Sequence, residues 1–239
     1  MSGRASEEAE LDNVVWHALR GRQSRFAERH ASGRALRFHP RVSIFCGVER
    51  LDEDGWAAQA DFAGEGGVAF LFRDEVPALP PGWAEIYRDT VLQLVARALD
   101  APPSVSFETL GDDDVEEMLA LTALTEPGPF LPGTVELGGY VGARRDGRLV
   151  AMAGRRFSVA GFTEVSAVCT HPEARGEGLG AALTLQVAHA IRAQGDEAFL
   201  HVVESNRGAL RLYRSIGFEV RRRVDVVGAQ WVGESGADS

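Results

Sequence analysis

The most constraining feature of the sequence is a strand, bend and helix pattern between residues 163 and 193. A run of β-branched and apolar residues, TEVSAVCT, precedes a proline, an arginine and three glycines at alternate positions, and a helical apolar pattern begins near Gly178. Glycine lets the main chain approach a ligand closely, and the first N–H groups of a helix have no partner within the helix. Such groups attract phosphate, so the pattern predicts a cradle for a pyrophosphate group.

The composition excludes several classes of phosphate-binding protein. All 25 basic residues are Arg and none is Lys, so the amine that a Walker A loop, a Schiff-base aldolase or a pyridoxal phosphate enzyme requires is missing. The formal net charge of -10 disfavours nucleic acid and anionic membranes as partners. Two cysteines, Cys46 and Cys169, predict reduced thiols and no metal site. The first fifteen residues lack a signal-peptide pattern and no apolar run matches a membrane span, so we expect a cytoplasmic protein.

A dinucleotide-binding protein is an alternative interpretation of the same glycines. Gly176, Gly178 and Ala181 fit the G-x-G-x-x-A spacing, and Glu204 follows the next strand, where an acid can bind a ribose. In a Rossmann unit, however, the first glycine directly follows the strand, whereas residues 171–175 intervene here. Roughly sixty residues follow the glycines, too few for the rest of such a domain. The sequence therefore favours another kind of phosphate cradle.

The remaining patterns predict two parts, residues 1–103 and 104–239, divided at the Pro102–Pro103 dipeptide. The first part is expected to contain helices over 11–29 and 84–99 and strands over 42–48 and 68–72, with a polar connection between the strands. For the second part we predict a strand over 104–110, a helix from 112 that ends before 127, a hairpin around 145–148, strands over 163–170 and 198–203, and helices over 178–193 and 207–216. We interpret the acidic run 112–114 as a helix start, not a metal cluster.

Two ordered motifs resemble those of the GNAT acetyltransferase superfamily. Residues 175–180, RGEGLG, resemble its acyl-CoA signature Q/R-x-x-G-x-G/A, and residues 204–218, ESNRGALRLYRSIGF, resemble its second hallmark of Asn, Ala, Tyr and Gly-Phe. The resemblance covers residues 104–239. It implies an α+β or α/β fold, with a GNAT-type mixed sheet flanked by helices and a smaller α+β N-terminal domain. In some family members that extra domain is a degenerate half of the same fold.

The resemblance also implies an activity and a set of site residues. The protein would move an acetyl group from acetyl-CoA directly to a primary amine of a small molecule or peptide, without a metal. CoA would bind between two splayed parallel strands, 163–170 and 198–203. The expected cofactor-binding residues are Val168, Cys169, Thr170, Arg175, Gly176, Glu177, Gly178, Leu179, Gly180, Ala181 and Asn206.

Tyr213 is expected to protonate the departing thiolate, although a packed aromatic next to Leu210 is its structural alternative. Glu164 lies near the position of a general base in many relatives, and a solvated or packing role is its alternative. We expect acceptor contacts from residues 125–134, from the hairpin and from the N-terminal part. A non-catalytic acyl-CoA sensor is the alternative function, and a homodimer is one option for the assembly.

Overall fold

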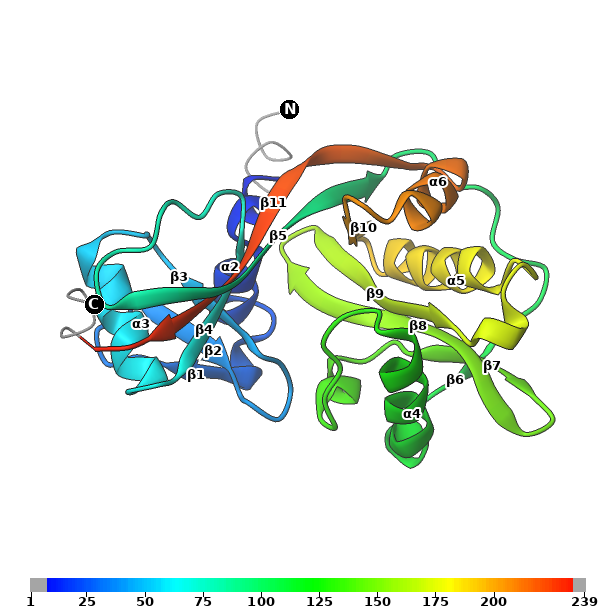
Figure 1. Ribbon diagram of the computed structural model, residues 1–239. Helices are drawn as coiled ribbons and strands as arrows, with labels where there is room; N and C mark the ends of the chain where they lie inside the picture. Colours follow the sequence, from blue (N-terminus) through cyan, green and yellow to red (C-terminus); the bar gives the residue numbers. More distant parts are fainter. Residues whose placement is uncertain (1–7, 234–239) are drawn as a thin grey trace.

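The computed structural model describes residues 8–233, which form an eleven-stranded sheet covered by helices (Figure 1). The strand order is β1-β2-β3-β4-β11-β5-β10-β9-β8-β7-β6. Residues 1–7, the start of the stretch without a signal-peptide pattern, lie outside the described residues. Among the described helices, none is long and apolar enough to cross a membrane.

The elements follow one another in two series. The first comprises η1 (Leu11–Asn13), α2 (Val14–Arg20), η2 (Ser24–Phe26), β1 (Ala27–Arg29), β2 (Ala35–Phe38), β3 (Phe45–Val48), α3 (Glu53–Ala63), β4 (Val68–Arg73) and β5 (Trp83–Ala96). The second comprises β6 (Glu108–Thr109), η3 (Asp112–Asp114), α4 (Val115–Thr125), η4 (Thr134–Leu137), β7 (Val141–Arg145), β8 (Arg148–Val159), β9 (Phe162–Thr170), η5 (Pro172–Ala174), α5 (Leu179–Ala193), β10 (Glu197–Val203), α6 (Arg207–Ser215) and β11 (Phe218–Trp231).

Local sequence signals account for most of the second series. The turn 146–147 joins β7 to β8 with positive φ angles of 51° and 79°, as a type I′ hairpin requires. The side-chain oxygen of Asn206 accepts a hydrogen bond from the N–H of Ala209 at 3.0 Å and so caps α6. Asp114 accepts from the N–H of Gly111 at 2.9 Å, where the chain enters α4. The acidic run therefore starts a helix, as predicted.

The helix predicted over 84–99 is wrong, because these residues form β5. This strand lies between β11 and β10 and is antiparallel to both. Every residue from Val91 to Ala96 is buried. A strand buried on both faces carries consecutive apolar residues without the period of two, so its pattern cannot be told from that of a buried helix.

Two smaller differences concern the ends of elements, and a third is a helix that was not predicted. Helix α2 ends at Arg20 instead of near residue 29, and β6 contains two residues instead of seven. Helix α3 occupies the segment expected to be a polar connection. Asp52 starts this helix by accepting a hydrogen bond from the N–H of Gly55 at 3.0 Å. Its few large apolar residues leave only a weak helical pattern, which explains the missed prediction.

The two series have the same strand arrangement. Strands β1 to β3 are antiparallel and β3 is parallel to β4, and the same pattern recurs from β7 to β10. A helix connects the parallel pair in each case, α3 in the first and α5 in the second (Figure 1). The N-terminal half is therefore a reduced copy of the C-terminal half.

The last strand of each half crosses into the other half (Figure 1). Strand β5 ends beside β10, and β11 ends beside β4, while the two strands pair with each other over most of their length. The sheet is consequently continuous across the predicted boundary at residue 103, which lies in the connection after β5. One hydrophobic cluster also spans both halves and includes Phe45, Phe72 and Phe157.

Candidate active site

The parallel strands β9 and β10 separate after three pairs of residues. Residues 162–164 pair with 197–199, and no later described residue of β9 pairs with β10. Ala167 has a φ of +52°, which is unusual for a residue with a side chain, and it lies in a register shift between β8 and β9. The bulge bends β9, and the strand edge that faces β10 is left open. This is a gap between splayed strands, as the family resemblance implied.

A cavity of about 720 Å³ occupies this gap. Of the residues predicted for the site, those that line it are Val168, Cys169, Thr170, Arg175, Gly180, Asn206 and Tyr213. The predicted residues that do not line it are Glu164, Gly176, Glu177, Gly178, Leu179 and Ala181. The strand, the bend and α6 therefore meet around one space, and the rest of the glycine bend adjoins it.

The glycine bend presents a row of free main-chain N–H groups. Within the described part of the chain, none of the N–H groups from Gly176 to Ala181 donates to an acceptor. Gly176 and Gly178 have φ angles of +86° and +80°, a region that favours glycine. The first main-chain bond of α5 runs from the N–H of Ala182 to the carbonyl of Gly178 at 3.1 Å. The row therefore has the chemistry of an anion site at a helix start.

The N-terminal half has no comparable anion site among its described residues. Its equivalent helix α3 begins with three acidic residues, 52–54, whose carboxylates disfavour a second anion. The end of β3 is covered by the segment before α2, because Asn13 Nδ2 donates to the carbonyl of Val48 at 2.8 Å. A Cβ atom on Gly47 would lie 2.6 Å from the main-chain nitrogen of Trp16. The repeat has thus kept the strands and lost the cradle.

Tyr213 projects from α6 into the cavity. The residue is 8% exposed and packs edge-on against Phe218 with 6.2 Å between the ring centroids. Its hydroxyl has no hydrogen-bond partner among residues 8–233, and the oxygen is accessible from the cavity. Burial, with a smaller effect of Cys169, raises the pKa of Tyr213 to about 12. The phenol is therefore neutral at pH 7 and has a proton to donate.

Cys169 lines the cavity but lacks the character of a nucleophile. Burial raises the pKa of its thiol to about 11, although a hydrogen bond with Thr125 lowers it in part. The thiolate is the reactive form, and it is scarce at neutral pH with such a pKa. Cys169 is therefore a small buried residue of β9.

Glu164 lies beneath the cavity, where its carboxylate is fully engaged. Arg156 donates to it twice, from Nε at 2.8 Å and Nη2 at 2.6 Å, and His201 Nδ1 lies 2.7 Å from Oε1. Burial raises the pKa of this carboxyl, but Arg156 and His201 outweigh that effect and lower the pKa to about 2. A buried carboxylate of this kind does not collect a proton from an amine at neutral pH. The contacts of Glu164 therefore disagree with the expected base and fit a group that positions Arg156 and His201.

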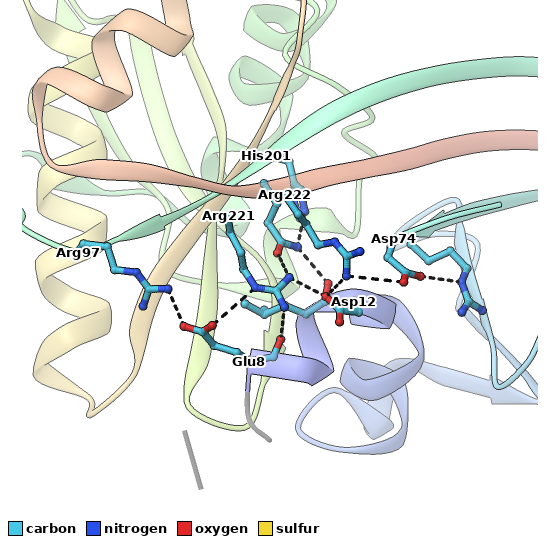
Figure 2. A network of polar contacts seen from close by, with 10 residues as sticks. Glu8, Asp12, Asp74, Arg97, His201, Arg221 and Arg222 are labelled. Carbon is cyan, nitrogen blue, oxygen red and sulfur yellow. Dashed lines mark hydrogen bonds and ion pairs between the residues drawn. The ribbon is translucent and has the colours of Figure 1, made fainter. Parts of the chain in front are cut away.

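His201 connects the cavity to a polar network that reaches the N-terminal segment (Figure 2). Its Nε2 lies 3.0 Å from Nε2 of Gln93, and that amide also donates to the carbonyl of Leu11 at 3.0 Å. Gln93 Oε1 accepts from Arg221 Nη1 at 2.8 Å, which fixes the amide orientation. The amide nitrogen is a donor, so His201 Nε2 accepts and Nδ1 carries the proton shared with Glu164. Burial lowers the pKa of His201, which keeps the ring neutral.

The same network joins the N-terminal segment to the long strands of the sheet. Asp12 binds Arg221 at 2.7 Å and Arg222 at 2.6 Å, and Glu8 binds Arg97 at 2.6 Å (Figure 2). Arg221 lies at a register shift between β11 and β5. The N-terminal segment thus helps to hold Gln93, and through it His201, in place.

Several residues of the cavity were not predicted from the sequence. Arg156 and His201 are polar residues within apolar strands, and such positions are the informative exceptions in a strand pattern. Glu126, which ends α4 with a φ of +48°, also lines the cavity, and its carboxylate has no partner in the described part of the chain. The loop 125–129 lines the cavity as expected, and the hairpin of β7 and β8 contributes Arg156, although its turn at 145–148 does not line the cavity.

The N-terminal half supplies the far wall of the cavity. Its contribution is apolar and aromatic and consists of Phe45, Phe72, Tyr87 and Val91, to which β11 adds Val226. The two halves therefore form one site, with the cradle on one side and the aromatic wall on the other.

The sequence and the structure both resemble known acetyltransferases. A family model described as FR47-like protein matches residues 140–227. A crystal structure described as an acetyltransferase from the GNAT family, from Novosphingobium aromaticivorans, is 37% identical with a TM-score of 0.84 and covers 92% of this chain and 97% of that chain. The mycothiol acetyltransferase of Thermomonospora curvata is 46% identical over 86 residues, which are 36% of this chain and 29% of that protein. The N-alpha-acetyltransferase RimI of Mycobacterium tuberculosis is 39% identical over 92 residues, which are 35% of this chain and 56% of that protein.

The extent of these similarities decides between the interpretations. The chain spans less than a third of the mycothiol acetyltransferase and just over half of RimI, whereas it matches the Novosphingobium structure over nearly all of both chains. The fold shared with the Novosphingobium structure overturns the alternative of a Rossmann domain. The matched proteins are named as acetyltransferases, which favours an enzyme over a non-catalytic sensor. The chain belongs to the GNAT family of acetyltransferases.

Proposed function

We propose that this enzyme transfers the acetyl group of acetyl-CoA directly to the amine of a small molecule. The observation that carries the proposal is the row of free N–H groups beside a cavity that reaches the Tyr213 hydroxyl. Oriented N–H groups from Gly176 to Ala181, with Arg175 at their start, suit a diphosphate. The open edge of β9 suits the amides of a pantetheine arm, which bind such an edge as an added strand does. Val168, Cys169 and Thr170 supply that edge.

Tyr213 acts on the leaving group in this proposal. When the thioester bond breaks, the sulfur becomes a thiolate that needs a proton, and the neutral phenol is the donor that faces the cavity. Asn206 caps α6 and thereby fixes the start of the helix that carries Tyr213. Tyr213 lies about two helical turns after Asn206, so the position of the phenol depends on this cap.

In this proposal Glu126 takes the base role that the family resemblance suggested for Glu164. The acceptor amine has to be neutral when it attacks the carbonyl carbon, so its extra proton needs an acceptor. Glu126 offers a carboxylate without a partner in the described part of the chain, and it lines the cavity. Glu164 instead holds Arg156 and His201 in the cavity wall. An acceptor amine is supported by the name of the related N-alpha-acetyltransferase. The cytoplasmic location and the homodimer stay predictions.

Isothermal titration and a thiol-release assay test this function in two steps. Titration of the full chain with acetyl-CoA and with CoA is expected to show saturable binding of both. A panel of amines is then incubated with acetyl-CoA, and free CoA thiol is measured against the spontaneous rate. Lack of binding would remove the cradle from the proposal. Binding without thiol release above the spontaneous rate for any amine would remove amine acetylation.

A further inference from the structure

The Arg156 side chain has N–H donors that no group among the described residues accepts. A guanidinium has five N–H bonds, and Glu164 accepts one from Nε and one from Nη2. Nη1 donates to no acceptor among residues 8–233, and this atom is accessible to solvent. Arg156 lines the main cavity and also a smaller recess beneath the loop 127–130. Its Nη1 is therefore open to whatever binds there.

The aromatic wall holds this guanidinium in one place. Its central carbon lies 4.5 Å from the ring centroid of Phe157, 5.2 Å from Phe72 and 5.4 Å from Phe45. The rings of Phe45 and Phe72 are themselves in edge contact at 5.3 Å. A cation that is packed and paired in this way has lost its side-chain freedom before a ligand arrives, so a ligand does not have to order it.

The orientation of the ion pair decides which charge it attracts. Glu164 is fully buried and does not line the cavity, whereas Arg156 does. The positive end of the pair therefore faces the ligand, and an ammonium group is disfavoured beside it. An oxyanion gains charge-assisted hydrogen bonds there, which are stronger than those of a neutral carbonyl. The overall charge of -10 repels anions, so the preference for an oxyanion comes from the local charge of Arg156.

The surroundings of Arg156 limit the rest of the ligand. Phe45, Phe72 and Val226 present apolar surface, and Glu126 presents the carboxylate that suits an ammonium group. A cavity of about 720 Å³ that also holds the end of an acyl-CoA arm leaves room for a small molecule. We propose that the acceptor is a small amine with a carboxylate and an apolar body, as in an apolar α-amino acid, and that Arg156 Nη1 binds the carboxylate. This inference rests on the proposed function, because it concerns the acceptor of the same site.

Two N-acetylated compounds of the same shape provide the test. N-acetylphenylalanine carries the carboxylate, and N-acetylphenylalaninamide replaces it with a neutral amide. Isothermal titration of each into the full chain measures binding without any turnover. We expect the carboxylate to bind about 10- to 100-fold more tightly, the range of a hydrogen bond to a charged group. Equal affinity, or no detectable binding of either compound, would overturn the inference.

Two variants separate Arg156 from the rest of the cavity. Replacement of Arg156 alone would leave a buried unpaired carboxylate, so the double variant Arg156→Met with Glu164→Gln removes both charges together. Its glutamine oxygen can still accept from His201. We expect this variant to lose the preference for the carboxylate. The single variant Glu164→Gln keeps the cation and is expected to keep or increase the preference, and a preference that survives in the double variant would overturn the inference.

Titration of the same preparations with acetyl-CoA keeps the two proposals apart. Acetyl-CoA binding without a carboxylate preference overturns only the acceptor class. A carboxylate preference that depends on Arg156, in a protein that does not bind acetyl-CoA, supports the anion site and overturns only the proposed function. Circular dichroism melts of each variant show that the comparison is made on folded protein.

Discussion

Replacement of Tyr213 by phenylalanine isolates the proton donor of the proposed reaction. The hydroxyl has no protein partner within residues 8–233, so its removal leaves no unpaired group and should change the free energy of unfolding by less than about 0.5 kcal/mol. Acetyl-CoA affinity should be nearly unchanged, because the phenol is needed only when the thioester bond breaks. Turnover should fall, because the departing thiolate then has to take its proton from water.

The size of the loss follows from the pKa of the phenol. General acids contribute roughly 10²- to 10⁴-fold. The pKa of Tyr213 is raised to about 12, whereas a thiol like that of Cys has a pKa near about 8.5. Full transfer from phenol to thiolate is therefore uphill by about 5 kcal/mol, so the phenol assists by partial transfer as the bond breaks. We expect a loss at the low end of the range, about 100-fold in kcat, which corresponds to about 3 kcal/mol in the barrier.

Thiol release at saturating acetyl-CoA and amine measures this loss, with titration of CoA as the binding readout. Tyr140→Phe is the matched control, because Tyr140 is also buried but its hydroxyl donates to the carbonyl of Arg155 at 3.2 Å. That variant should lose about 1 kcal/mol of stability and keep kcat within about threefold. A Tyr213→Phe enzyme with a kcat within about threefold of the wild type would remove the phenol from the mechanism. Because the phenol stays protonated up to about pH 12, the wild-type rate should not fall between pH 8 and 10 through Tyr213.

Three further changes test the cradle, the fold and the buried ion pair. A valine at Gly180 would place its Cβ 3.8 Å from Leu212, an ordinary contact, so Gly180→Val should leave the melting temperature near that of the wild type. Because Gly180 lines the cavity, the added side chain should weaken acetyl-CoA binding at least about tenfold by titration. Gly217 has a φ of +96°, and a Cβ atom there would lie 1.8 Å from the carbonyl oxygen of Ala98. Gly217→Ala should therefore lower the free energy of unfolding, measured in urea, by about 3 kcal/mol. A loss below about 0.5 kcal/mol would contradict the geometry. The lowered pKa of His201 means that the unfolded chain binds its proton first, so stability should decrease as the pH falls below 6.5. Glu164, with a folded pKa of about 2, adds a second decrease between about pH 4.5 and 2. In urea unfolding, Glu164→Gln should show a smaller decrease over this range, because Glu117 and Glu173, whose pKa values are also lowered, still contribute.

The C-terminal half was predictable because its signals are local. The Asp-Gly turn at 146–147, the asparagine cap at 206 and the glycines at 176–180 each impose a backbone geometry on their own neighbours. Each signal lies within a few residues of its effect. The order of these elements and the position of the cradle therefore follow from the sequence alone.

The partners of charged residues were not predictable in this way. Glu164 has the same position in the strand whether its carboxylate faces water or Arg156, and the pairing of β8 with β9 decides which. Helical spacing in β5 was misleading because its burial comes from β10 and β11, which follow about a hundred residues later in the chain. The aromatic wall likewise depends on Phe45 and Phe72, which reach the cavity because the long strands β5 and β11 cross between the halves. These features depend on long-range pairing, for which a single sequence carries no period or motif.

The crossing of β5 and β11 gives the repeated fold a division of labour. In the N-terminal half, Asn13 and the acidic start of α3 close the position where the other half has its cradle. That half can therefore present aromatic side chains to the shared cavity without forming a second anion site. Because β5 covers one edge of β10 and β11 covers one edge of β4, neither half has a complete sheet without the other. Exchange of the last strands thus fixes the distance between the cradle and the aromatic wall, as the proposed direct transfer between two bound molecules requires.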